Sequence, residues 1–412
     1  MHHRLFPPAH FLLASARMSR PRTPLRLLPV LSVIGSLLML TQCSSPEART
    51  EVRRAEGAGG TELFPVPLSL NIPKDAVTLN DAARFLAGMP ALSGRDSFRD
   101  LRATSQWQAH ASKMDGLWND FTARHGQPVS SWASSELGDL RGANAVFYPF
   151  SGPDFLFAHL FFPRAETYLL CGLEPCSPLP EWPSLTPQNI TDGCDGLYDS
   201  LDNILQFSYF ITKEMRSDLQ STRFRGVLPV FMVFLARTGH HVDSIEAVKL
   251  DDNGNPFIYA TSQTTPPGLL IRYSGQGGSK RIFYFAQDLS NASCRPGGPF
   301  LRFAASLGQP AALAKSASYL MHESSFSNIR NHVLTQCRGI VQDPSGIPYS
   351  AFASSGWKTQ LYGNYIRTID VFNNHQQPDL AAAYATGGGK PINFGIGYLV
   401  VPETTSLMVA RP

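Results

Sequence analysis

The sequence has few charged residues, and their distribution excludes a nucleic-acid-binding surface. Asp, Glu, Lys and Arg make up 16% of the 412 residues, while apolar residues make up 43%. This composition is typical of a globular chain that buries a core. Five of the 35 basic residues are arginines within residues 1–42, which contain no acidic residue, so the rest of the chain has 30 basic and 32 acidic residues. Because no cluster of Lys and Arg with interleaved aromatics remains, we predict no nucleic-acid partner.

The sequence also lacks an apolar run long enough to span a membrane. Its run over residues 27–40 has 14 residues, whereas a transmembrane helix needs about 20. Arginines precede this run and polar residues follow it at once, which is the pattern of a cleaved secretory signal peptide. We therefore predict a signal peptide over residues 1–42, with Met18 as an alternative start that leaves a short basic head.

The end of the apolar run carries a motif of its own. Leu40, Thr41, Gln42 and Cys43 follow one another there, and they resemble the lipobox of bacterial lipoproteins, in which Leu and two small residues precede a cysteine that becomes lipidated. Gln42 departs from the small residue of that pattern. The resemblance implies a lipid anchor on Cys43 and a place in the cell envelope. Ser44 stands where an Asp favours inner-membrane retention in that family, which implies the outer membrane in a cell with two membranes.

The remainder of the chain divides by composition. Residues 43–62 are rich in charge and Gly and have no apolar periodicity, which is typical of a flexible tether. Beyond them, helical and strand patterns alternate, and a chain of this length exceeds the usual size of a single core. We therefore predict two α+β lobes, over residues 63–195 and 196–412, divided near a Pro-rich stretch.

Helices are predicted from their ends and their periodicity. Residues 78–90 begin with a Thr cap and end with Gly and Pro, so they predict a helix. Large apolar residues recur every three or four positions between residues 107 and 121, which indicates a helix with one buried face. Residues 227–239 are almost wholly apolar, with Pro near the start and Gly at the end, and this favours a buried helix.

Strands are predicted from short runs that are rich in Phe, Tyr, Val and Leu. Three such runs, at residues 143–150, 154–162 and 166–174, indicate an antiparallel β meander. Turn sequences rich in Gly within residues 244–262 and 268–287 predict two hairpins. The predicted fold class is therefore α+β, with a helical N-terminal part, an antiparallel β meander, and then hairpins packed with helices.

Besides the predicted anchor, the chain has five cysteines, and an exported protein can oxidise them. Cys176 and Cys194 bracket the Pro-rich stretch, while Cys294 and Cys337 bracket a helical region. We predict these four as two disulfides, one of three possible pairings. Cys171, within an apolar run, is predicted to be a buried thiol.

Residue types used in catalysis are present, but their local spacing does not build a site. His322 and Glu323 lack the second His one turn later that a zinc helix requires. Ser151, Asp154 and His159 offer hydrolytic side chains without the glycines that expose a nucleophile. We assign no catalytic residue, keep these five as secondary candidates, and predict neither a metal site nor a cofactor.

Together these patterns favour a non-enzymatic, lipid-anchored envelope protein. It would be a structural or binding module whose partner is the membrane, through the lipid, and either an envelope protein or a small ligand. The alternative is a periplasmic or surface hydrolase that acts on a cell-wall or extracellular polymer. The two differ in one structural requirement, because an enzyme needs two or three titratable groups that converge in a cleft.

The anchor can be tested by fractionation. Cys43→Ala should move the mature protein from the detergent-extracted membrane fraction to the soluble envelope fraction, because the acylated cysteine is lost. Cys171→Ala is the matched control and should remain with the membrane. Identical fractionation and acyl labelling of all three proteins would contradict the lipid assignment.

Overall fold

The computed structural model describes residues 78–92, 96–180, 182, 185–210, 222–258, 265–275 and 277–412. These residues belong to one compact unit. The predicted signal peptide, Cys43 and the predicted tether lie outside the described residues.

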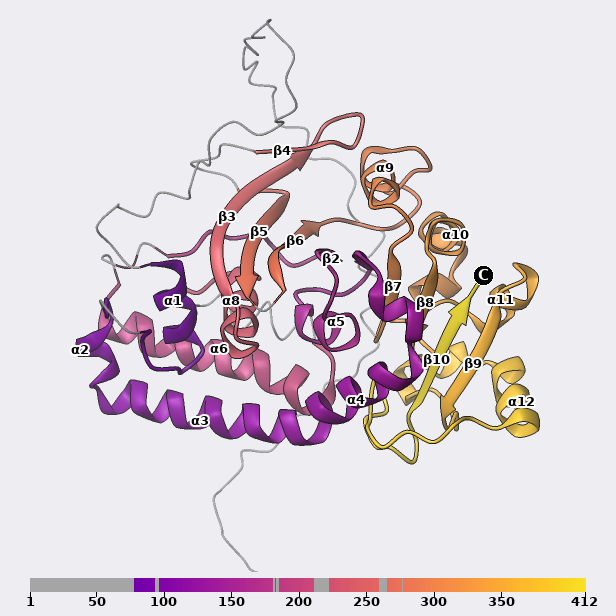
Figure 1. Cartoon of the computed structure of the whole chain (residues 1–412), viewed down its shortest axis with the longest axis horizontal. Coiled ribbons are helices and arrows are strands. Elements are labelled where there is room, and N and C mark those ends of the chain that lie inside the picture. Colours follow the sequence, from indigo (N-terminus) through magenta and orange to yellow (C-terminus); the bar gives the residue numbers. More distant parts are fainter. Residues whose placement is uncertain are drawn as a thin grey trace, which may run out of the picture. The chain divides into compact units, whose positions relative to one another are not determined.

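One mixed sheet of ten strands runs through this part of the chain, in the order β4-β3-β5-β6-β2-β1-β7-β8-β10-β9 (Figure 1). The five central strands, from β6 to β8, are parallel to one another. Antiparallel strands extend the sheet on both sides. The strands are β1 (Ala145–Tyr148), β2 (Thr167–Gly172), β3 (His241–Leu250), β4 (Pro256–Ile258), β5 (Gly268–Gly275), β6 (Gly278–Ala286), β7 (Ala311–Ala314), β8 (Gly339–Gln342), β9 (Lys358–Gly363) and β10 (Ser406–Arg411).

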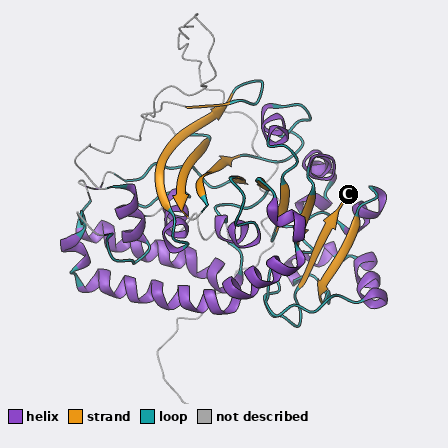
Figure 2. Ribbon diagram, viewed as in Figure 1, coloured by secondary structure: helices purple, strands orange, loops and turns teal. Residues whose placement is uncertain are grey.

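Helices cover both faces of the sheet (Figure 2). One face is covered by α1 (Leu79–Leu86), α3 (Ser105–Phe121), α4 (Gln127–Glu136), α5 (Phe155–Phe161), α6 (Pro187–Phe207) and α8 (Leu228–Arg237). The other is covered by α9 (Pro299–Ser306), α10 (Ser327–Gln336), α11 (Tyr349–Ser354) and α12 (Pro378–Gly387). The short helix α2 (Arg99–Arg102) precedes α3. This mixture of helices and a mixed sheet fits the predicted α+β class.

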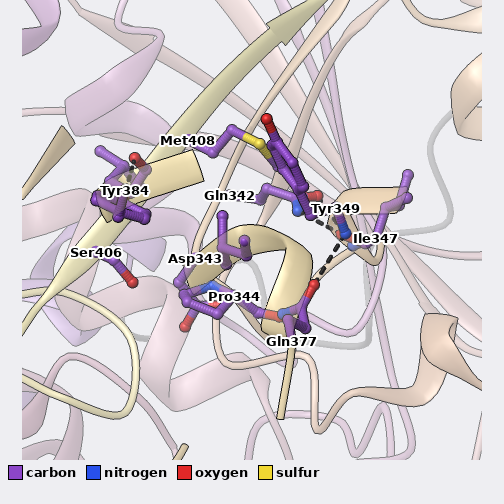
Figure 3. Close-up of a pocket in the computed structure, with 11 residues that line it drawn as sticks. Gln342, Asp343, Pro344, Ile347, Tyr349, Gln377, Tyr384, Ser406 and Met408 are labelled. Atoms are coloured by element: carbon purple, nitrogen blue, oxygen red, sulfur yellow. Dashed lines mark hydrogen bonds between the residues drawn. The ribbon is translucent and has the colours of Figure 1, made fainter. Parts of the chain in front are cut away.

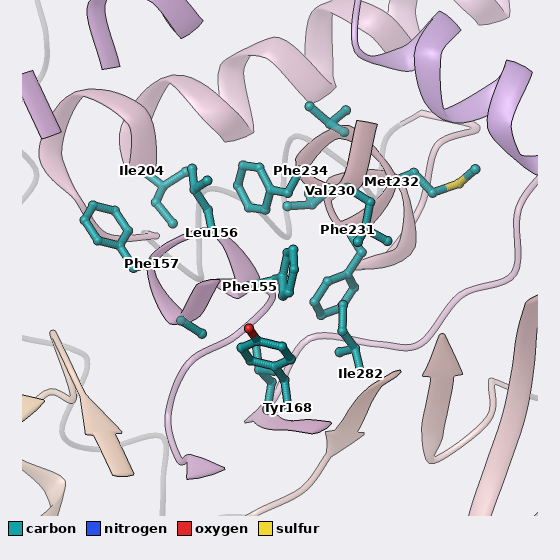
Figure 4. Close-up of a cluster of buried hydrophobic side chains, with 14 of the residues drawn as sticks. Phe155, Leu156, Phe157, Tyr168, Ile204, Val230, Phe231, Met232, Phe234 and Ile282 are labelled. Atoms are coloured by element: carbon teal, nitrogen blue, oxygen red, sulfur yellow. The ribbon is translucent and has the colours of Figure 1, made fainter. Parts of the chain in front are cut away.

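The central strands are mostly apolar because both of their faces are largely buried. Alternate residues of β1 enter opposite cores: Val146 and Tyr148 pack under α5 and α8, while Phe147 packs toward α9 and α10. Figure 4 shows the first core, where Phe155 of α5 and Phe231 of α8 lie over β2 and β6. A strand buried on one face would instead alternate between apolar and polar residues.

The predicted meander is wrong, because its middle run is a helix. Residues of α5 follow Asp154, whose side chain accepts a hydrogen bond from the Phe157 amide at 3.1 Å and so caps the helix. The helix links β1 to β2, which pair in parallel. Its phenylalanines are buried around most of the helix. The sequence therefore shows no polar face, and the helical period cannot be recognised from the pattern of polar and apolar residues.

Several local predictions are confirmed. Thr78 caps α1 by accepting from the Asp81 amide, and the apolar residues of 107–121 lie on the buried face of α3. The run at 227–239 forms α8. The two predicted hairpins are β3–β4 and β5–β6.

The sheet does not divide at the predicted lobe boundary. Residues 195 and 196 lie inside α6. Strands from before this point, β1 and β2, lie between β6 and β7, which come after it. In the described part of the chain, no helix has the length and apolarity needed to cross a bilayer.

Candidate functional site

The candidate site lies where the connections between the parallel strands change direction. From β1 the chain passes to β2 on one side, whereas β7 pairs with β1 on the other side and leads on to β8. The parallel strands therefore follow the doubly wound order 3-2-1-4-5, with a switch point between β1 and β7. In open α/β sheets, ligands bind outside the carboxyl ends of the strands at such a point.

A buried ion pair joins the carboxyl ends of β1 and β7. Lys315 directly follows β7, and its Nζ lies 3.0 Å from Oδ2 of Asp154, with both side chains 2% exposed. Lys315 also donates to the Ser208 carbonyl at the end of α6, and its ammonium lies 4.3 Å from the centre of the Phe157 ring. The Tyr148 hydroxyl donates to the same Asp154 oxygen at 2.9 Å.

Burial governs the protonation of this group. It raises the pKa of Asp154, while the charge of Lys315 and the three hydrogen bonds to the carboxyl oppose that effect. Burial and the Asp154 charge both raise the pKa of Tyr148, so the phenol keeps its proton and remains a hydrogen-bond donor.

A second buried acid follows β8. Asp343 accepts from the Ser316 amide at 3.0 Å and from the amide and hydroxyl of Ser345 at 3.0 and 2.5 Å. Burial raises its pKa, and these hydrogen bonds oppose the rise. Gly397 packs against this carboxylate: its φ is +75°, and a Cβ there would lie 2.0 Å from Oδ2 of Asp343. Only glycine fits at position 397.

The backbone around the switch point is strained. Six described non-glycine residues have a positive φ, which costs energy for residues with a side chain. All but Gln309 lie at this edge of the sheet, after β1, after β7 or against Lys315. They are Phe150 (59°), Ser208 (63°), Ser316 (54°), Ser318 (53°) and Tyr319 (57°). Such strain gathers at functional sites, where surrounding contacts hold it in place.

Aromatic side chains pack together at this strained segment. We call Tyr209, Tyr319, Phe372, His375 and Tyr398 the aromatic cluster. Neighbouring rings have centroids 5.1 Å apart in the pairs Tyr209–Tyr398, Tyr319–Phe372, Tyr319–His375 and Phe372–Tyr398. The Tyr398 hydroxyl donates to the Ser316 carbonyl at 2.9 Å, which ties the cluster to the loop after β7.

Exposed apolar side chains lie close in the chain to members of the aromatic cluster. Ile366, Val371 and Val401 are 54%, 58% and 51% exposed, and Phe207, next to the Lys315 contact at Ser208, is 43% exposed. Val371 adjoins Phe372 in the chain, and Val401 follows Leu399, which shares a small cavity with Tyr398. An interaction surface is marked by exposed apolar side chains that gather in one patch, and these four are the candidates for such a patch.

Two small cavities lie beside Asp343. One of about 20 Å³ lies between Asp343, Tyr319 and Tyr398. A second of about 10 Å³ lies behind Asp343, where the Gln342 and Gln377 side chains bond to backbone groups (Figure 3). Each has room for about one water molecule.

The crevice differs from a dinucleotide site in its phosphate position. In such sites the first helix N-terminus binds the pyrophosphate. Here Pro153 has no amide hydrogen, and the Asp154 carboxylate occupies the N-terminus of α5. Glu174 follows Gly152 by 22 residues, at the end of β2, but it packs against Gly152 and accepts from the Tyr284 hydroxyl at 3.0 Å. A phosphate at α5 would therefore meet a buried carboxylate.

The candidates from the sequence lie at separate places. Ser151 donates to and accepts from the backbone of Cys171, so it ties the loop after β1 to β2. His159 lies at the far end of α5, with its ring centroid 4.9 Å from that of His240. His322 and Glu323 contact His375 beside the aromatic cluster. Only Asp154 belongs to the ion pair.

Lys315, Asp343 and Tyr398 were not singled out from the sequence. The first two are polar residues that come one position after a buried apolar strand, and this is the signal that could have found them. Tyr398 lies in a loop with no such signal. Among the described residues, no group of three His, Cys, Asp or Glu is placed to hold a metal ion.

All five described cysteines carry free, buried thiols. Burial raises the pKa of Cys176, Cys194, Cys294 and Cys337 to about 12, so the thiols resist oxidation while they remain buried. Cys176 and Cys194 belong to one core and Cys294 and Cys337 to the other. The pairing of each set stays a prediction.

Comparison with known proteins gave no match to a family model, to a curated protein or to a solved structure.

A double-mutant cycle tests the ion pair. Lys315→Met should lower the free energy of unfolding by roughly 3–5 kcal/mol, because Asp154 is left buried without its cation. Combining it with Asp154→Asn should recover most of this loss, since Asn keeps the helix cap without the charge. Urea denaturation measures both.

The exposed pair of Lys113 and Asp195, 3.4 Å apart, supplies the control. Lys113→Met should change the unfolding free energy by about 0–1 kcal/mol. Equal losses for the single and double Lys315 variants would show that packing, not charge, stabilises this position.

Histidines at the other end of the sheet should make stability depend on pH. Burial, followed by His240 and Lys280, lowers the pKa of His159 to about 3, against about 6.5 in the unfolded chain. Between these values the unfolded chain binds a proton that the folded chain does not, so stability falls as pH falls from 6.5 toward 4, by up to about 1.4 kcal/mol per pH unit.

His159→Phe should therefore flatten the stability curve between pH 6.5 and 4 in urea denaturation. The phenyl ring preserves the packing against Phe155, whose ring centroid is 5.5 Å away. Parallel curves for the two proteins would contradict the assignment.

Proposed function

We propose that this chain is an exported, lipid-anchored envelope protein whose folded body binds another envelope protein. The export and anchoring parts of the proposal rest on the apolar run over residues 27–40 and on Cys43, which lie outside the described residues. The binding part rests on the aromatic cluster.

One observation carries the binding proposal. At the switch point of the sheet, strained backbone holds the aromatic cluster against buried polar groups, and Ile366, Val371 and Val401 are exposed in the chain segments that supply Phe372, His375 and Tyr398. If these apolar side chains contributed only to stability, they would be buried rather than exposed to water. Tyrosines and exposed apolar groups on a rigid support are typical of protein–protein interfaces.

The described cavities beside Asp343 are smaller than a ligand. Two cavities beside Asp343, one of which is lined by Tyr319 and Tyr398, are each about one water in volume, whereas small-molecule sites are usually about 300–1,000 Å³. A protein surface laid over the cluster needs no deep cavity, so the geometry favours a protein partner at this edge.

The hydrolase hypothesis receives less support. It requires candidate groups that meet in one cleft, but His159 lies at the opposite end of α5 from Asp154. His322 and Glu323 contact His375. Asp154 itself is fully engaged with Lys315, Tyr148 and the helix amide.

Site-specific photocrosslinking in intact cells tests the proposal. A photoreactive phenylalanine analogue at position 371 or 401 should give the same discrete protein adduct, because both positions border one surface. The analogue at Phe257, which is 43% exposed on β4, is the matched control and should not give this adduct.

Ile366→Asp in the same chain should abolish the adduct from position 371, since a charge would have to be desolvated in the interface. Absence of an adduct from both rim positions, or an identical adduct from position 257, would overturn the proposed binding surface.

A further inference from the structure

A second surface lies away from the switch point, between α9 and α10. A groove there has a volume of about 350 Å³, which is within the range of small-molecule sites. We call it the α9–α10 groove. Its lining residues are Pro296, Gly297, Leu301, Arg302, Ala305, Asn328, Asn331, His332, Thr335 and Gln336.

One face of α10 supplies the polar side of the groove. Asn328, Asn331, His332, Thr335 and Gln336 follow one another at spacings of three and one, so they share one face of the helix. They present amide, imidazole and hydroxyl groups, which both donate and accept hydrogen bonds. This side of the groove carries no acidic residue and no thiol, which argues against a metal ligand set.

Some of these polar groups have no partner among the described residues. His332 is 8% exposed, its Nε2 is buried without a hydrogen bond, and its ring packs edge-on against Phe147, with centroids 5.7 Å apart. Burial lowers the pKa of His332 to about 4, so the ring is neutral at pH 7. A buried polar atom without a partner costs free energy, which a bound ligand can offset.

Other groups of the groove are already fixed. Asn328 donates its amide to the Cys294 carbonyl at 3.1 Å, and the Thr335 hydroxyl donates to the Asn331 carbonyl at 2.8 Å. These hydrogen bonds fix the orientation of the Asn328 and Thr335 side chains. The Asn331 side chain and the Arg302 guanidinium are exposed, and neither makes a hydrogen bond or an ion pair with the described part of the chain.

The chemistry of the lining selects a ligand class. The exposed lining is mostly apolar in area, as in most small-molecule sites, but six hydrogen-bonding side chains accompany Leu301, Ala305 and Pro296. Paired donors and acceptors suit hydroxyl groups, each of which both donates and accepts. Arg302 is the only charged residue of the lining, and its planar guanidinium matches one carboxylate.

We propose that the α9–α10 groove binds a monosaccharide-sized, hydroxyl-rich ligand that carries one carboxylate, the chemistry of an acidic sugar. Arg302 binds the carboxylate, the amides of α10 bind hydroxyl groups, and Leu301 contacts the carbon skeleton. This assignment is independent of the proposed protein partner, because no residue of the aromatic cluster lines the groove.

Calorimetric titration of the full-length protein with sodium glucuronate, and separately with glucose, tests the assignment. Glucuronate should bind saturably at millimolar concentrations and at least tenfold more tightly than glucose, which corresponds to about 1.4 kcal/mol. Arg302→Gln should remove this preference, and Asn331→Leu should weaken both sugars. Both side chains are exposed, so the variants should keep the parent stability in urea.

The matched control is Arg164→Gln, an exposed arginine outside the groove, which should bind as the parent does. No saturable binding of glucuronate overturns the proposal. Binding that both groove variants leave unchanged places the sugar elsewhere and overturns it equally, and equal affinity for glucose rejects the carboxylate assignment.

Discussion

The buried ion pair between Asp154 and Lys315 is the constraint on which the centre of this fold depends. It joins the helix that follows β1 to the end of β7, and through the Ser208 carbonyl it reaches the end of α6. Two charges taken out of water at this depth are tolerated only when they are paired and hydrogen-bonded. The helical layer and the middle of the sheet must therefore pack in one relative position. In any other position, one of the two ions would lose its partner.

The same pair dictates the chain path that follows β7. Lys315 points into the interior, whereas Tyr319, four residues later, joins the aromatic cluster. Ser316 and Ser318, which lie between them, adopt left-handed conformations. Their cost is offset by the hydrogen bonds that Asp343, Ser345 and Tyr398 make with this segment. The buried charge of Lys315 and the ring of Tyr319 thus lie at the two ends of one strained segment.

Local sequence signals predicted the elements whose determinants are local. Thr78 and the Gly254 turn specify a helix start and a hairpin within a few residues. The helix α5 was missed because its apolar residues face protein on nearly every side, which removes the polar face that reveals a helical period. The pairing of β1 with β7 spans more than 160 residues, and no local pattern encodes it. The role of Lys315 in the ion pair depends on that pairing, so the sequence around Lys315 could not predict it.

Strand β1 connects the two surfaces physically. Its residues Phe147 and Tyr148 point to opposite faces: Phe147 packs against His332 in the α9–α10 groove, and Tyr148 donates to Asp154 in the ion pair. All four residues of β1 are buried, and a closely packed interior does not deform continuously. A ligand in the groove can influence a partner at the aromatic cluster only if it favours one of two positions of this strand. Because neighbouring strands pair with β1 on both sides, such a shift would have to move the switch point itself.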